Sequence, residues 1–162
     1  MHARAQEIIT LLQLLPHPEG GRFRRAFCST RTVHRAVTGE PRPALTSIFY
    51  LLLAGETSDW HCVASDEAWH HYEGAPLALR IATPQAECCS RHELGPLTPQ
   101  RSPLQVVPAQ HWQSARSLGD FSLVGCSVGP GFDFADFCLA RELGADQASV
   151  RERLRALDLT AD

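Results

Sequence analysis

The spacing of apolar residues changes along the chain from a helical period to a strand period. Between Ala3 and Leu15, apolar residues recur every three to four positions with polar residues between them, which is typical of an amphipathic helix. Prolines at positions 16 and 18 end this pattern, because proline cannot continue a helix. The apolar face of the predicted helix consists of Ile8, Leu11, Leu12 and Leu15.

Short apolar runs separated by turns follow, at intervals of roughly ten residues. The run at residues 45–56, LTSIFYLLLAGE, is apolar on both faces and is expected at the centre of a sheet. Residues 29–43 are polar with glycine and proline, and are expected to form a loop or a long hairpin connection. Helical patterns return only at Phe134–Leu143 and Ala145–Leu157. This order predicts an all-β sandwich or barrel rather than βαβ units.

The densest chemistry lies between Trp60 and Gly74, WHCVASDEAWHHYEG, which contains three of the eight histidines and two of the three tryptophans. Side chains alternate between the two faces of a strand, so Glu67, Trp69 and His71 are expected to share one face. A turn at residues 64–66 would form a hairpin and bring His61 across from Glu67 inside one cavity. The alternative is that the two are a satisfied polar pair at the edge of a sandwich.

The spacing of His61, Glu67 and Gly74 resembles the first motif of the cupin superfamily, and the stretch PAQHWQ at residues 108–113 falls where the second motif is expected. The stretches LPHPEGGRFRRAF, VVPAQHWQ and LVGCSVGPGFDFADF resemble one cupin branch of unassigned function. This resemblance runs from about Ile8 to Arg141. It implies an all-β, cupin-type double-stranded β-helix, a jelly-roll barrel with short N- and C-terminal helices, as a single domain over residues 1–162.

The resemblance is incomplete at the positions that bind metal in cupins. Three histidines and one glutamate serve there, and only His61 and Glu67 are retained, because Val63 and Gln113 stand at two histidine positions. Imidazole and carboxylate groups do most of the binding in such sites. No cofactor is therefore expected; if a metal binds, its ligands would be His61, Glu67 and Gln113.

Without metal, His61 and Glu67 form an acid–base pair, with His61 as base and Glu67 as acid or orienter. Three aromatic residues and two polar ones are expected to contact the ligand: Tyr50, Trp69, His71, Trp112 and Gln113. Flat aromatic walls of this kind favour a small polar, carbohydrate-like ligand. The leading prediction is a metal-independent epimerase or isomerase. The alternatives are a metal-dependent oxygenase or isomerase, and a non-catalytic binding or sensor module.

Some residues near this site have a plainer structural interpretation. Phe132, Phe134 and Phe137 are expected to anchor the terminal helix to the barrel, and Asp133 and Asp136 to cap that helix. At least two of the three arginines at positions 22, 24 and 25 are interpreted as a solvated strand edge.

Composition narrows the remaining classes. The net charge of −3 and the isoelectric point near 6.2 argue against a general nucleic-acid-binding surface. All fifteen basic residues are arginine, which excludes lysine Schiff-base chemistry. Six scattered cysteines, no signal peptide and no apolar stretch of membrane-spanning length indicate a cytoplasmic protein without membrane partners. The cupin resemblance and the arginine-rich first strand also suggest a homodimer.

Overall fold

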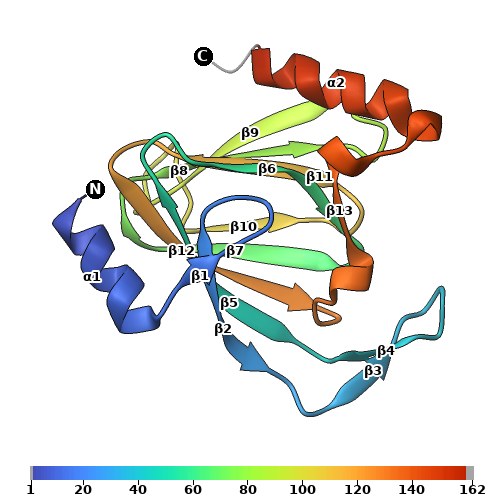
Figure 1. The fold of residues 1–162 in the computed structure, drawn as a ribbon, viewed down its shortest axis with the longest axis horizontal. Helices are drawn as coiled ribbons and strands as arrows, with labels where there is room; N and C mark the ends of the chain where they lie inside the picture. The colour runs from blue at the N-terminus through green and yellow to red at the C-terminus, as the bar shows by residue number, and fades with distance from the viewer. Residues whose placement is uncertain (1, 160–162) are drawn as a thin grey trace.

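A computed structural model, which describes residues 2–159, shows two antiparallel sheets that pack face to face as a jelly-roll barrel (Figure 1). The barrel predicted from the sequence is therefore confirmed. The six-stranded sheet has the order β1 (Leu15–Pro16), β2 (Arg22–Cys28), β5 (Thr46–Leu53), β12 (Phe121–Gly129), β7 (Asp66–Gly74) and β10 (Leu104–Val107). The five-stranded sheet has the order β13 (Phe137–Leu139), β6 (Thr57–Val63), β11 (Trp112–Ser117), β8 (Leu77–Ala82) and β9 (Cys89–Leu94).

Strand β5 lies inside the six-stranded sheet, between β2 and β12, as its doubly apolar sequence predicts. Tyr50 and Leu52 point into the barrel, where they join Trp69 and Val124 in the main core. Leu51 points to the opposite face and packs with the N-terminal helix. Both faces of β5 are thus removed from water, which is the main stabilising term in such a core.

Helix α1 (Ala3–Leu12) covers part of the outer face of the six-stranded sheet, with Ala5 and Ile8 buried. It ends at Gln13, which adopts the left-handed conformation with φ of 52°. The helix is therefore shorter than predicted, because Leu15 already pairs in β1.

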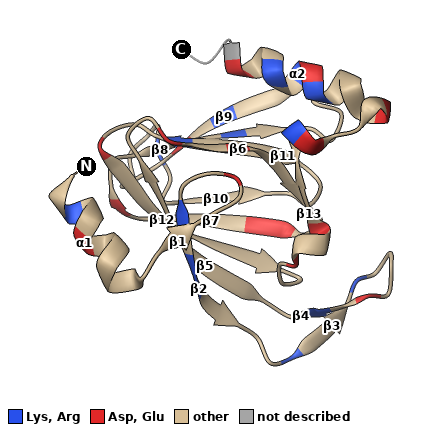
Figure 2. Ribbon diagram, viewed as in Figure 1, with Lys and Arg blue, Asp and Glu red and all other residues tan. Residues whose placement is uncertain are grey.

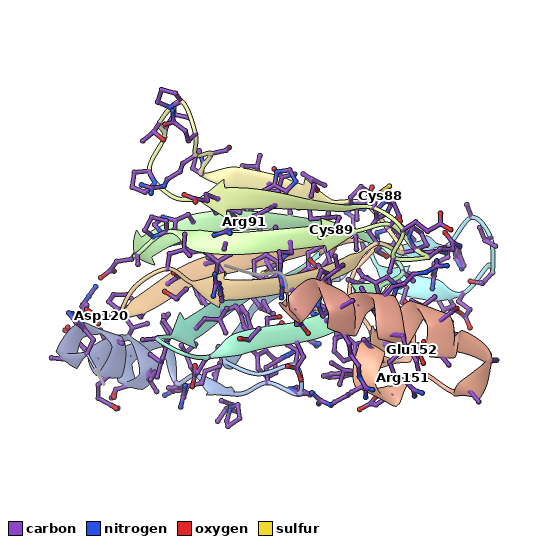
Figure 3. The ribbon with its side chains drawn as sticks, turned by 90° about the horizontal axis from the view of Figure 1, so that it is seen from above. Cys88, Cys89, Arg91, Asp120, Arg151 and Glu152 are labelled. Atoms are coloured by element: carbon purple, nitrogen blue, oxygen red, sulfur yellow. The ribbon has the colours of Figure 1, made fainter. Side chains whose placement is uncertain are left out.

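Helix α2 (Ala148–Leu159) lies across the five-stranded sheet, with basic and acidic residues interspersed along it (Figure 2). Figure 3 shows this helix from above, with Arg151 and Glu152 labelled on it. Its residue Asp158 accepts hydrogen bonds from Trp60 Nε1 at 2.9 Å and from Arg80 at 2.7 Å, and so fastens the end of the helix to the sheet. No helix within residues 2–159 is long and apolar enough to span a membrane.

The helix expected at Phe134–Leu143 is wrong. This segment instead forms a 3₁₀ turn, η1 (Phe134–Asp136), then β13, then a second 3₁₀ turn, η2 (Ala140–Glu142); a third, η3 (Ala145–Gln147), precedes α2. Strand β13 forms because Phe137 to Leu139 pair with His61 to Val63 of β6, a partner that local spacing does not reveal.

The connection at residues 29–43 contains a small hairpin of β3 (Thr32–His34) and β4 (Pro41–Pro43) that extends from the barrel (Figure 1). Two of its arginines, Arg35 and Arg42, bind Asp136 at distances of 2.6 to 2.9 Å. Asp136 thus joins the hairpin to η1 and does not cap a helix as expected, whereas Asp133 does cap η1 through Ala135 N.

Candidate functional site

A pocket of about 520 Å³, its open mouth included, lies between the two sheets at the end of the barrel beside η1. Its polar lining residues are His17, Arg25, Thr46, His61 and Glu67, and most of the remaining wall is aliphatic or aromatic. Phe132, Phe134 and Phe137 are part of that wall, so these phenylalanines line the pocket and do not serve only as anchors for a terminal helix.

His61 and Glu67 both face this pocket, although they do not lie on paired strands. Strand β6 belongs to the five-stranded sheet and β7 to the six-stranded sheet, so the chain crosses from one sheet to the other at the turn after Val63. The two side chains therefore face each other across the barrel interior. They are almost fully buried, with 2% and 7% of their surfaces exposed.

The imidazole of His61 is held in one orientation. Its Nδ1 lies 2.8 Å from the backbone carbonyl oxygen of Asp59 and donates to it, since a carbonyl oxygen only accepts. Nε2 is then the nitrogen available for proton transfer. It lies 3.2 Å from Oε2 of a second carboxyl group, that of Glu19.

Glu19 comes from the loop between β1 and β2, and the sequence analysis missed it. Its Oε1 accepts a hydrogen bond of 2.9 Å from Ser58 Oγ, and His17 Nδ1 lies 3.5 Å from its Oε2. The loop can enter the barrel because Gly20 has a φ of 110°, and a Cβ atom there would collide with the carbonyl oxygen of Thr57. The stretch HPEGG was visible in the sequence, but only its glycine turn was interpreted.

Burial shifts the protonation of all four groups. It raises the pKa of Glu19 and of Glu67, and it lowers the pKa of His61 and of His17. The charge on Glu67 partly opposes the effect on His61, so these two groups interact electrostatically across the pocket. Burial therefore disfavours the charged form of each of these groups.

Gln113 and Trp69 lie behind Glu67. The indole Nε1 of Trp69 donates to Gln113 Oε1 at 2.8 Å, and Gln113 Nε2 donates to Glu67 Oε2 at 2.6 Å. Because an indole can only donate, the amide oxygen must face Trp69. Both residues, which the sequence analysis assigned to ligand contact, are fully buried and orient Glu67. Tyr50 is also fully buried, and its hydroxyl donates to the carbonyl oxygen of Gly20 at 2.8 Å.

Trp112 and His71 lie outside the pocket. Trp112 packs with Trp60 on the outer face of the five-stranded sheet, because neighbours on a strand point to opposite faces and Gln113 points inward. His71 lies four residues after Glu67 on β7, with Trp69 between them. Its Nε2 is 3.0 Å from the carbonyl oxygen of Ala75. Neither side chain is positioned to touch a ligand in this pocket.

The metal site typical of cupins does not fit these residues. Val63 provides no donor, and the oxygen of Gln113 is already occupied by the Trp69 indole, which leaves only its amide nitrogen directed at Glu67. In residues 2–159, no group of three or more His, Cys, Asp or Glu side chains is arranged to hold a metal ion. The donor set that the resemblance implies is thus incomplete at this position.

The jelly-roll barrel is the architecture of cupins, among other families. The Cupin_5 family, described as "Cupin superfamily (DUF985)", matches residues 6–140, and the chain belongs to this family. Among solved structures, a protein from Shewanella oneidensis is 31% identical with a TM-score of 0.79, covering 95% of this chain and 94% of that one. A hypothetical protein from Leishmania major is 29% identical with a TM-score of 0.78, covering 91% and 97%.

More distant structures share the fold alone. A cupin 2 conserved barrel domain protein from Rhodopseudomonas palustris is 15% identical with a TM-score of 0.55, covering 90% of this chain and 87% of that one. An oxalate decarboxylase from Bacillus subtilis has the same identity and TM-score, covering 76% of this chain and 29% of that one. No curated protein matches the sequence.

Proposed function

We propose that this cupin-fold protein is a metal-independent isomerase or epimerase that moves a proton on a small molecule bound in the pocket. The observation that carries the proposal is the geometry of His61. Its Nδ1 is bonded to the Asp59 carbonyl, its Nε2 is directed at Glu19, and Glu67 faces it from the opposite sheet. Two titratable groups on opposite sides of one pocket can act on opposite faces of a ligand.

In the proposed reaction, His61 Nε2 removes a proton from carbon and Glu67 supplies a proton from the other side. Neutral His61 is suited to act as a base and protonated Glu67 as an acid, which matches the direction in which burial shifts each pKa. The imidazolium formed on His61 lies 3.2 Å from Oε2 of Glu19 and favours the ionised form of that carboxyl group, which then balances the new charge. Gln113 keeps Glu67 directed at the pocket.

The choice of ligand requires a revision of the carbohydrate-like prediction. That prediction relied on Tyr50, Trp69 and Trp112 as flat walls, but the first two are buried in the core and the third lies outside the pocket. The exposed rings in the pocket are phenylalanines, which offer no hydrogen bonds to sugar hydroxyl groups. Sugars are therefore no longer the leading ligand class, but they are included among the compounds tested below.

The test is exchange of carbon-bound hydrogen for solvent deuterium, followed by proton NMR. Aldoses and 2-oxo acids, including phenylpyruvate, are incubated in D₂O with the wild-type protein and with His61→Asn, which retains an N–H for the Asp59 carbonyl. The proposal expects exchange above the protein-free rate on at least one compound, lost in His61→Asn and retained in His92→Asn, a histidine outside the pocket. Exchange that persists in His61→Asn, or binding without any exchange, would refute it; the second result would support the non-catalytic binding module.

The metal-dependent alternative has its own measurement. Elemental analysis is made on protein purified without an affinity tag or added metal. It should find less than about 0.1 equivalent of iron, nickel, manganese or zinc per chain. One full equivalent, lost in Glu67→Gln, would contradict the metal-independent proposal.

A further inference from the structure

Arg25 lines the pocket that contains His61 and Glu67. Among the described residues that line this pocket, it is the only one with a permanent positive charge. It lies on β2 opposite Ile48, and both side chains point to the inner face of the six-stranded sheet. Its guanidinium has no hydrogen-bond or ion-pair partner within residues 2–159, whereas its neighbour Arg22 on the same strand pairs with Glu56 at 2.8 Å. The sequence analysis interpreted at least two of the three arginines on this strand as a solvated edge. Arg25 is exposed, as that interpretation predicts, but it also lines the mouth of the pocket.

The wall next to Arg25 is aromatic. Phe132, Phe134 and Phe137 contact one another with ring centroids 5.1 to 6.1 Å apart, and Phe23 packs edge-on against His17. Phe134 is 53% exposed, although it belongs to this cluster. Because Phe134 contacts Phe132 and Phe137 at the pocket, its exposed ring belongs to a continuous apolar surface, which is a feature of ligand-binding grooves.

From these two features we propose that the ligand is a small organic acid, with its apolar or aromatic framework against the phenylalanines and its carboxylate on Arg25. This inference rests on the proposed function for the identity of the pocket and names the substrate class that the pocket takes. A guanidinium binds a planar carboxylate through two parallel hydrogen bonds. A doubly charged phosphate fits less well, because a single arginine would face two negative charges in a pocket with no other permanent positive charge.

The positions of Arg25 and Glu67 also constrain the ligand. Their strands are separated by β5 and β12, so the two backbones are about 14 Å apart at the usual strand spacing. The side chains shorten this distance from both ends. The carboxylate that binds Arg25 is therefore not the group that reacts; the reacting carbon lies several bonds away, next to His61 and Glu67.

The experiment compares one acid with its uncharged analogue. Binding of 3-phenylpropanoate and of 3-phenylpropanamide is measured by isothermal titration calorimetry on the wild type, on Arg25→Gln and on Arg24→Gln. Arg24 is the matched control, because it is an exposed, unpartnered arginine within the described chain whose side chain lies on the outer face of the same strand. Phenyl phosphate serves as the third probe.

The inference expects the acid to bind the wild type and Arg24→Gln roughly tenfold or more tightly than the amide, as a charge-assisted pair allows. Arg25→Gln should reduce the affinity for the acid to that for the amide and leave the amide unchanged. Equal binding of acid and amide, an equal loss in both arginine variants, tighter binding of phenyl phosphate, or no binding of either phenyl probe at millimolar concentration would each overturn it.

The result is separable from that of the proposed function. Selective binding of the acid without deuterium exchange on any compound would leave this inference standing and refute the isomerase. Exchange on neutral compounds, with no effect of Arg25→Gln, would do the reverse.

Discussion

Replacing Asp136 with asparagine should destabilise the segment that carries Phe134 and Phe137 over the pocket. Asp136 accepts hydrogen bonds from Arg35 at 2.6 Å and from Arg42 at 2.7 and 2.9 Å. Its side chain is only 7% exposed, and those of the two arginines are 15% and 11% exposed. The substitution removes the negative charge that the two arginines share. It leaves Arg35 without its carboxylate partner and Arg42 with only the exposed Glu40 at 3.2 Å.

The expected loss of stability at pH 7 is about 2–3 kcal/mol. A hydrogen bond to a charged group contributes about 1.5–3 kcal/mol, and the asparagine oxygen retains part of one of the three contacts. Breaking a fully buried ion pair costs about 3–5 kcal/mol, which sets an upper limit for this partly exposed cluster. For a chain of this length the melting temperature should fall by about 4–12 °C.

The loss should also depend on pH. Hydrogen bonds from Arg42, aided by Arg35, hold the pKa of Asp136 below its ordinary value. A lowered folded-state pKa stabilises the protein above the unfolded pKa of about 4, and this contribution disappears as the pH falls through the folded value. Urea denaturation of wild type and Asp136→Asn at pH 7 and at pH 3.5 should therefore show a difference in free energy of unfolding that shrinks at the lower pH.

Asp133→Asn is the matched control. Asp133 lies in the same segment and accepts a hydrogen bond from Ala135 N at 2.9 Å, a capping role that asparagine performs equally well. It should change stability by less than about 0.5 kcal/mol. A loss for Asp136→Asn that is no greater than this, or one that is the same at both pH values, would show that the cluster does not hold the segment.

Three further outcomes are expected. Gln113→Leu should cost about 2 kcal/mol in urea denaturation, because it leaves the buried indole N–H of Trp69 without an acceptor; a change under about 0.5 kcal/mol would contradict the hydrogen-bond assignment. Gly20→Ala should lower the melting temperature far more than Gly39→Ala, since both glycines have positive φ but only the first has backbone atoms where a Cβ would lie; equal effects would remove the steric argument. Asp158→Ala should destabilise the protein by about 1–2 kcal/mol and shift tryptophan fluorescence, as the end of α2 detaches from the sheet; unchanged fluorescence would show that the contact is not maintained in solution.

The sequence was most informative where the alternation of side chains along one strand decides which face of the sheet a residue occupies. Alternation placed Glu67 and Trp69 on the inner face of β7, and the doubly apolar run at Thr46–Leu53 is indeed an interior strand. The same rule, applied consistently, would have excluded Trp112 from the pocket once Gln113 was directed inward. That error came from weighing residue type above strand period.

The sequence was least informative where one segment's structure depends on a distant partner. Phe137 to Leu139 carry a helix-like spacing, yet they form a strand because β6 offers an unpaired edge there. In the same way, the turn after Val63 has the composition of a hairpin turn, although the two strands that it joins lie in different sheets. Local propensity cannot decide between these outcomes, because the energy that decides comes from tertiary pairing.

Glu19 shows why half of the site was missed. It lies 42 positions before His61 in the sequence and reaches it only because the backbone turns through two glycines of positive φ and carries the loop across the open end of the barrel. No period within a strand describes such an approach. The available signal was chemical: a histidine and a glutamate on either side of a proline, directly before two glycines.

The chemistry of that cluster is itself an argument for function. Glu19, His61 and Glu67 are each less than 10% exposed, and burial disfavours the charged form of all three. Apolar side chains of similar volume at these positions would remove that desolvation cost, and such replacements of buried polar clusters are often neutral or stabilising. The fold supports these groups with dedicated partners, such as Ser58 for Glu19 and Gln113 for Glu67. A cluster that costs stability and is nevertheless oriented group by group supports the proposal that it transfers protons to a ligand in the adjoining pocket.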